Sequence, residues 1–190
     1  MPDYKPTGKR YAEEYGVPWE VFEPQIQRES KWQQFRPDGH IVTSAAGALG
    51  LGQLMPDTAR ELGVNPMNPT ENLRGAAMYD AKLLRYYNGD PVRALAAYNW
   101  GSGRVDHWNR QRSTLPAETR QYLDDILGPN WTGLPSGDQP PDGTTPEPDP
   151  STRDPIIDFS AIRDWWNAEK SMMVSRGLGS GSGPVVPSGG

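Results

Sequence analysis

The sequence predicts a mainly α-helical domain with at most a small β-hairpin, followed by a disordered linker and a short C-terminal amphipathic helix. Three observations support this fold class. Apolar residues recur at helical spacing in the first part of the chain. Proline, aspartate and glycine stand where helices begin and end. Glycine and proline account for 23 of the first 132 residues but for 18 of the last 58, so the chain changes character near residue 132.

Six helices are expected in the first 132 residues, and most begin with a proline, whose fixed φ suits the first turn. Their boundaries are, in order, Pro18 to about Trp32, Pro56 to Gly63, about Pro69 to Tyr87, a start at Asp90-Pro91, a short helix after Gly103, and a start near Pro116. The fourth helix has Asp90 as its N-cap. Asp38-Gly39 predicts a turn between two short extended arms, which is the one β element expected.

The remaining residues divide into three parts. Residues 133–155 are rich in Pro, Gly, Ser, Thr and Asp, cannot bury enough apolar surface to fold, and are predicted to form a linker after the domain at 1–132. In residues 156–176, apolar side chains recur at roughly helical spacing and predict an amphipathic helix. Residues 177–190 are predicted to form a flexible Gly/Ser tail.

Composition excludes several functional classes. The net charge of −5 and the pI near 5.1 argue against a nucleic-acid-binding protein, which is usually basic. The absence of cysteine excludes disulfides, thiolate zinc sites and a cysteine nucleophile. Two histidines, His40 and His107, argue against a His-rich metal site. No apolar segment is long enough for a membrane span, and the N-terminus lacks the apolar core of a signal peptide.

Glu29 is the candidate catalytic residue. It shares a face of the first expected helix with Phe22 and Ile26 and lies near the C-terminal end of that helix. An apolar surrounding and the negative end of the helix dipole both favour the protonated carboxyl, which is what general-acid chemistry requires. The alternative is an exposed glutamate near a helix end, beside Arg28 or Lys31.

Five motifs surround this glutamate in a fixed order. They are Glu29-Ser30, the segment from Ser44 through Gly50-Leu-Gly-Gln-Leu-Met-Pro56, the segment from Asn72 to Tyr79, the segment from Ala94 through Tyr98-Asn99 to Val105, and the segment from Leu115 through Glu118-Thr-Arg to Tyr122. This set resembles the soluble-lytic-transglycosylase (SLT) domain of the lysozyme-like superfamily over about residues 11–127. The resemblance implies a lysozyme-like helical domain that acts on peptidoglycan.

The resemblance also implies a reaction. The bond cleaved would be the β-1,4 link between N-acetylmuramic acid and N-acetylglucosamine. A single glutamate, Glu29 by position, would protonate the leaving oxygen and then act as a base, so that the muramic C6 hydroxyl closes onto C1 as a 1,6-anhydro end. This chemistry requires no metal and no cofactor.

Six further residues are implied as substrate-binding: Ser44, Gln53, Met55, Tyr98, Asn99 and Glu118. Ser44 would hydrogen-bond the muramic residue near the scissile bond, and Gln53 and Met55 would line the cleft near the acid. Tyr98 would donate its hydroxyl to the substrate N-acetyl group or to Glu29. Glu118 would help to close the far wall of the cleft.

Three departures from the family pattern affect these expectations. Gly52 stands where the family often has methionine, which predicts a wider or looser cleft floor. Trp100 stands where a small residue is usual, and it is a candidate platform for a sugar ring or, alternatively, a packed side chain. Residues 32–42 form an insertion that carries Asp38, either a second carboxylate for hydrolysis or an exposed turn residue.

Two alternative functions therefore stay open beside the transglycosylase: a lysozyme-type hydrolase that uses Glu29 and Asp38, and a non-catalytic virion or wall-binding module. The lack of a signal peptide favours a phage virion protein that degrades the wall locally during passage of phage DNA. Alternatives are an endolysin released late in infection and a bacterial periplasmic enzyme whose leader is absent. The apolar face around Trp165-Trp166 would bind other virion proteins or the enzyme's own surface.

Overall fold

The computed structural model describes residues 2–134, which form seven α-helices, two short 3₁₀ helices and isolated β-bridges. The elements are α1 (Lys5–Glu14), α2 (Trp19–Ser30), α3 (Pro56–Glu61), α4 (Pro69–Tyr86), α5 (Pro91–Trp100), α6 (Ser102–Val105), η1 (Arg112–Thr114), α7 (Ala117–Leu127) and η2 (Trp131–Gly133). The prediction of a mainly helical domain with a minimal β element is confirmed. The predicted linker, amphipathic helix and tail lie outside the described residues.

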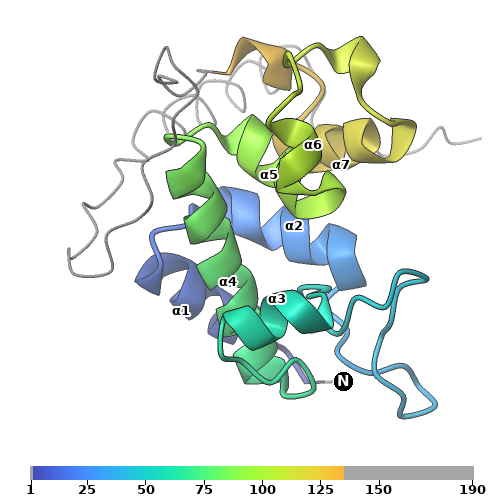
Figure 1. The fold of residues 1–190 in the computed structure, drawn as a ribbon. Helices are drawn as coiled ribbons and strands as arrows, with labels where there is room; N and C mark the ends of the chain where they lie inside the picture. Colours follow the sequence, from blue (N-terminus) through green and yellow to red (C-terminus); the bar gives the residue numbers. More distant parts are fainter. Residues whose placement is uncertain (1, 135–190) are drawn as a thin grey trace, which may run out of the picture.

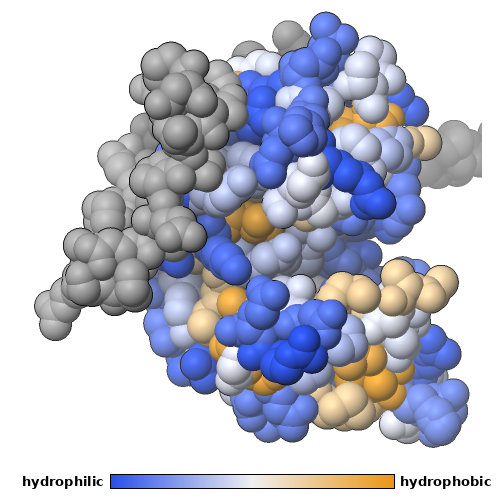
Figure 2. All heavy atoms as spheres, viewed as in Figure 1, coloured by the Kyte–Doolittle hydropathy of each residue, from blue (hydrophilic) through white to orange (hydrophobic). Residues whose placement is uncertain are grey.

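Helix α2 lies in the middle of the molecule (Figure 1). It packs against α1 on one side and α7 on the other, while α4 packs against α1 and α5. Figure 2 shows that this face of the molecule is hollowed between an upper half, formed by α5 to α7, and a lower half, formed by α3 and the segment at residues 31–54. The C-terminal end of α2 is therefore surrounded by both halves of the domain.

The core has two main apolar clusters. One joins α1, α2 and α4 and includes Phe22, Ile26 and Leu73, each of which has no exposed surface. The other joins α4, α5, α7 and η2 and includes Leu123 and Trp131. Burying side chains of this size stabilises the fold by about 1.5–3 kcal/mol each. Because Phe22 and Ile26 belong to α2, burial of the face that they share holds this helix in place.

Helix α1 is an element that the sequence did not predict. Its sequence contains Pro6 and Gly8, and few of its residues are apolar. Gly8 explains how the helix packs, since a Cβ there would lie 2.8 Å from Cη2 of the Trp32 ring. The glycine therefore lets the indole of a distant residue lie directly on the helix, a contact that no local sequence pattern reveals.

Helix α2 ends two residues before the predicted end at Trp32. Lys31 and Trp32 adopt positive φ angles of 56° and 61°, a conformation that is unfavourable for residues other than glycine. Packing of the Trp32 ring against Trp19, with ring centroids 5.9 Å apart, offsets this strain. The chain consequently leaves the axis of α2 in a sharp turn directly after Glu29-Ser30.

The expected β element is reduced to isolated bridges. Phe35 pairs with Ile41 across the Asp38-Gly39 turn, and Leu49 pairs with both Thr43 and Leu54. No longer strand forms within residues 2–134. The segment at residues 31–54 is thus a chain of turns, and side-chain hydrogen bonds decide its shape.

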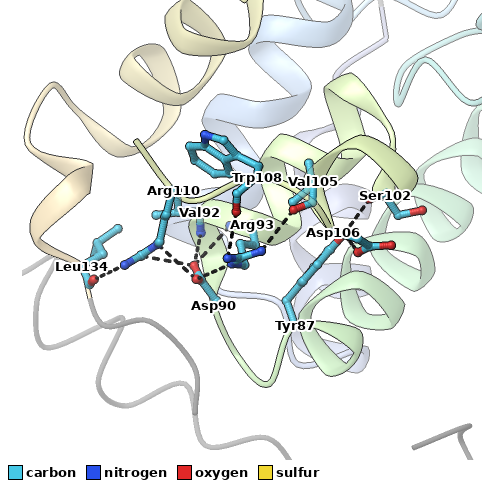
Figure 3. Close-up of polar contacts among 10 residues, drawn as sticks. All are labelled: Tyr87, Asp90, Val92, Arg93, Ser102, Val105, Asp106, Trp108, Arg110 and Leu134. Carbon is cyan, nitrogen blue, oxygen red and sulfur yellow. Dashed lines mark hydrogen bonds and ion pairs between the residues drawn. The ribbon is translucent and has the colours of Figure 1, made fainter. Parts of the chain in front are cut away.

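A network of hydrogen bonds and ion pairs surrounds Asp90 at the start of α5 (Figure 3). Asp90 caps α5, as predicted, because its Oδ1 accepts hydrogen bonds from the backbone N–H groups of Val92 and Arg93 at 2.9 and 3.1 Å. Arg110 donates from Nη2 to the same oxygen and from Nη1 to the carbonyl of Leu134 at 3.0 Å. The network thereby fastens the last described residues to the start of α5.

Candidate active site

Glu29 occupies the last turn of α2, where α2 meets α7. Its side chain is partly buried, and the hydroxyl of Tyr122 on α7 donates a hydrogen bond of 2.6 Å to its Oε1. Arg28, the neighbouring residue, points away into an ion pair with Asp125 at 3.0 Å. The carboxyl is therefore held by one neutral donor, with its strongest nearby cation paired elsewhere.

The pKa of Glu29 is raised from its ordinary value to about 7. Burial is the main cause, because it disfavours the charged form. The Tyr122 hydrogen bond and the charge of Arg28 lower the pKa, and the negative charge of Glu118 raises it. Near neutral pH the carboxyl is consequently available in both its protonated and its ionised form, as a group that acts in turn as acid and base must be.

Tyr122 was not among the predicted site residues. It is almost fully buried, and burial raises its pKa well above the ordinary value, so that its hydroxyl keeps its proton and remains a donor. It ends the fifth motif, on the helix that starts near Pro116, but the sequence assigned it no role. What separates it from an ordinary core residue is its contact with Glu29, which lies 93 positions earlier in the chain.

A pocket of about 230 Å³ lies between the two halves of the domain, in the hollow visible in Figure 2. Five of the predicted site residues line it: Gln53, Met55, Tyr98, Asn99 and Trp100. Thr58 and Tyr79, which the sequence reasoning did not single out, also line it. Residues from α3, α4 and α5 and from the turn before α3 thus converge on one cavity.

Gln53 is positioned by its backbone as well as by its side chain. Its φ of 47° lies in the left-handed region, and its Nε2 donates to the carbonyl of Gly50 at 2.7 Å. Two buried amides hold this turn: Gln34 accepts from the N–H of Leu51, and Asn72 accepts from the N–H of Gly52. The turn is therefore fixed before any ligand binds.

Of the two partners expected for the hydroxyl of Tyr98, Glu29 is not its acceptor. This hydroxyl donates a hydrogen bond of 2.6 Å to the carbonyl of Gly52, whereas the donor to Glu29 is Tyr122. Burial is the main cause that raises the pKa of Tyr98 well above its ordinary value, and the nearby charges of Asp80 and Glu29 raise it further. Tyr98 therefore lies close to Glu29, and its hydrogen bond joins α5 to the turn at Gly52.

The floor at Gly52 is closed. A Cβ at this position would lie 2.6 Å from the Cβ of Ala76 on α4, and 3.3 Å from the hydroxyl of Tyr98. At this point α4 fills the space that a larger side chain would need, so Gly52 itself leaves no opening, and a wider cleft floor stays a prediction.

Three predicted site residues lie outside the pocket lining: Glu29, Ser44 and Glu118. Ser44 is exposed, and its Oγ accepts a hydrogen bond from the N–H of Ala48 at 3.0 Å. Glu118 is exposed on the first turn of α7, and its charge raises the pKa of Glu29. Glu118 is thus electrostatically coupled to the acid, while Ser44 stabilises its own turn.

Asp38 lies at the exposed tip of the 31–54 segment. Its Oδ1 accepts a hydrogen bond of 3.0 Å from the N–H of His40, which is the geometry of a local turn. Asp38 is not among the groups that shift the pKa of Glu29. The structure therefore gives this carboxylate the role of a turn residue.

No cluster of three or more His, Asp or Glu side chains within residues 2–134 has the arrangement of a metal site. None of the helices in this part of the chain combines the length and the apolar character needed to cross a bilayer.

The comparisons with known proteins agree on one family. The model of the transglycosylase SLT domain matches residues 7–121. The chain is 40% identical over 89 residues to a transglycosylase of Enterobacteria phage PRD1, covering 46% of this chain and 32% of that protein. It is 35% identical over 131 residues to the membrane-bound lytic murein transglycosylase F of Pseudomonas fluorescens, covering 65% of this chain and 26% of the relative.

A solved structure shares the fold. An inactive mutant of the lytic transglycosylase Slt from Pseudomonas aeruginosa superimposes with a TM-score of 0.52 and 27% identity, over 68% of this chain and 23% of that one. The chain thus spans about a third or less of the length of these relatives. Because the family model covers most of the described helices, from α1 to α7, the chain belongs to the transglycosylase SLT domain family.

Proposed function

We propose that this protein is a peptidoglycan lytic transglycosylase in which Glu29 is the single general acid and base. The substrate bond is the β-1,4 link between N-acetylmuramic acid and N-acetylglucosamine. The observation that carries the proposal is the environment of Glu29: burial raises its pKa to about 7, Tyr122 donates a hydrogen bond to it, and its charge acts on Tyr98, which lines the pocket.

The reaction needs two proton transfers at one carboxyl. First, protonated Glu29 gives its proton to the bridging oxygen, and the bond from that oxygen to the muramic C1 breaks, releasing the N-acetylglucosamine hydroxyl. The carboxylate then takes the proton of the muramic C6 hydroxyl, and O6 forms a bond to C1. The product carries a 1,6-anhydro ring, no water is consumed, and Glu29 regains its proton.

The pocket supplies contacts for the sugars. Gln53, Met55, Asn99 and Trp100 present amide, thioether and indole groups to a ring that enters the hollow, and Trp100 offers a face for stacking against sugar C–H groups. The hydroxyl hydrogen of Tyr98 is used by Gly52, so the oxygen of Tyr98 serves as an acceptor for the N-acetyl N–H. Ser44 and Glu118 extend the contacts beyond the pocket.

Two alternatives receive less support. Hydrolysis by a second carboxylate would need Asp38 near the acid, whereas Asp38 is bound in its own exposed turn. A purely structural module has no need for a buried glutamate whose pKa lies near 7, because burying an ionisable group costs stability.

Mass spectrometry of the soluble products from purified peptidoglycan tests the proposal. The wild-type chain and Glu29→Gln are run in parallel, and circular dichroism confirms that both are folded. We expect anhydro-muropeptides from the wild type alone. Ordinary reducing-end products would establish a hydrolase and direct attention to Asp38, and the absence of soluble products would favour a wall-binding module.

We further propose that the enzyme acts at the bacterial cell wall as part of a phage particle. The similarity to the phage PRD1 transglycosylase supports this setting. The residues after 134 would then bind other virion proteins. Detection of the chain in purified particles, together with wall-degrading activity of those particles, is expected, whereas a chain found only in the bacterial periplasm would contradict the proposal.

A further inference from the structure

Asp80 and Gln25 form a polar pair in the core between α4 and α2. Nε2 of Gln25 donates a hydrogen bond of 2.9 Å to Oδ1 of Asp80. Gln25 has no exposed surface and Asp80 is 3% exposed. Gln25 lies one helical turn before Glu29, on the same side of α2. The pair therefore lies in the core, one turn of α2 before the turn that carries Glu29.

Each side chain has one oxygen that is buried without a hydrogen-bond partner: Oδ2 of Asp80 and Oε1 of Gln25. When Asp80 is ionised, both atoms are acceptors and neither can satisfy the other. An unsatisfied buried polar atom costs about 1–3 kcal/mol. A proton on Oδ2 makes it a donor to Oε1, so that one proton satisfies both atoms in a ring of two hydrogen bonds.

The surroundings of Asp80 contain acids and phenols. Glu29 faces it from α2, Tyr98 from α5 and Tyr122 from α7, and Tyr79 precedes it on α4. Burial raises the pKa of Asp80 well above its ordinary value, the Gln25 hydrogen bond lowers it, and the charge of Glu29 raises it. Among the described residues, no lysine or arginine contributes to this pKa.

We propose that Asp80 keeps a proton in the working enzyme and forms with Gln25 a neutral carboxylic acid–amide pair that positions the last turn of α2. The contribution of the pair to catalysis rests on the proposed function, because the turn that it positions carries Glu29. Asp80 is a positioning residue: it holds its proton through the reaction cycle, and Glu29 alone exchanges protons with the sugar.

The protonation of Asp80 can be measured without any turnover. The full chain is labelled with ¹³C at the aspartate carboxyl carbons and titrated by NMR, and Asp80→Asn identifies the signal of Asp80. We expect this signal to keep the chemical shift of a protonated acid well beyond the pH near 4 at which an ordinary aspartate titrates, and throughout the pH range in which the enzyme is active. A signal that titrates near pH 4 overturns the proposal. If Asp80→Asn does not fold, backbone correlations in the wild type provide the assignment.

Kinetics test the positioning role. Asparagine reproduces the neutral pair, because its Nδ2 donates to Oε1 of Gln25, whereas leucine leaves the Gln25 amide unpaired. We expect Asp80→Leu to lower kcat by about tenfold to a hundredfold with little change in KM, as for a misplaced catalytic group. Asp80→Asn, in contrast to Asp80→Leu, should keep most of the wild-type kcat. It should also keep the wild-type midpoint of the alkaline limb of the pH–activity profile.

The two measurements separate the proposals. If Asp80→Asn shifts that midpoint to lower pH, Asp80 is charged in the wild type and the proposal fails, since loss of a nearby negative charge lowers the pKa of Glu29. If the peptidoglycan products contradict the transglycosylase but the NMR signal behaves as expected, the neutral pair stands and only its catalytic meaning is lost.

Discussion

The hydroxyl of Tyr122 donates a hydrogen bond of 2.6 Å to Oε1 of Glu29 and thereby joins α7 to α2 at the candidate acid. This contact opposes the effect of burial, because a donor favours the ionised carboxylate while burial favours the protonated form. The balance leaves the pKa of Glu29 at about 7. Removing the donor should therefore move the acid toward permanent protonation.

Tyr122→Phe deletes this donor and keeps the ring that packs in the core. We expect the pKa of Glu29 to rise, the alkaline limb of the activity profile to shift to higher pH, and kcat to fall by about tenfold, since a hydrogen bond to a charged group is worth about 1.5–3 kcal/mol. The pH dependence of muropeptide release measures both effects. Tyr87→Phe is the matched control, because Tyr87 donates to Asp106 away from the pocket. An alkaline limb that does not move would contradict the contact.

The raised pKa of Glu29 also predicts how stability depends on pH. Between its ordinary value of 4.5 and about 7, the folded chain binds this proton more tightly than the unfolded chain. The free energy of unfolding should therefore fall as the pH rises through this window, by at most roughly 3 kcal/mol for this group. Urea unfolding at several pH values measures it. Glu29→Gln should flatten the decline, and an equally steep decline in that variant would assign it to other groups.

Gly52→Ala tests the close contact beneath the pocket. The added Cβ would lie 2.6 Å from the Cβ of Ala76, so one of the two backbones has to shift. We expect a loss of about 1–3 kcal/mol in stability and a higher KM, because Gln53 follows directly. Gly103→Ala is the control, since no atom lies within 4 Å of its added Cβ. Equal behaviour of the two variants in thermal unfolding would disprove the tight contact.

Asp90→Ala should affect stability without affecting the chemistry. It removes the N-cap of α5 and a buried acceptor of Arg110, and caps of this kind contribute about 0.5–2 kcal/mol. We expect a lower Tm but unchanged kcat and KM at temperatures well below the transition. A specific loss of kcat in folded protein would mean that the network in Figure 3 also positions the site.

The sequence predicted the features that depend on neighbouring residues. Proline at the first turn marked α3, α4 and α5, and the Asp90 cap was found because capping is a contact over two or three residues. The apolar neighbours of Glu29 along one helix face indicated its raised pKa. In each case the sequence signal lies within a single element, although burial of Glu29 also needs the packing of α7.

The features that were missed depend on residues far apart in the chain. Helix α1 is shaped by the Trp32 ring lying on Gly8. The partner of Glu29 is a tyrosine on α7, and Asp80 meets Gln25 across 55 positions. Such contacts arise only when tertiary packing places the helices side by side, and periodicity within one helix contains no information about them.

Helix α7 connects the residue that contacts Glu29 with the last described residues. It carries Tyr122 and, two positions later, Asp124, which binds Arg112 and the indole of Trp131. The family match stops at residue 121, one position before Tyr122. A fragment trimmed to that match would lose Tyr122 and with it the hydroxyl that donates to Glu29, the candidate acid. Anyone who transplants this candidate site into another protein therefore needs the chain through Leu134.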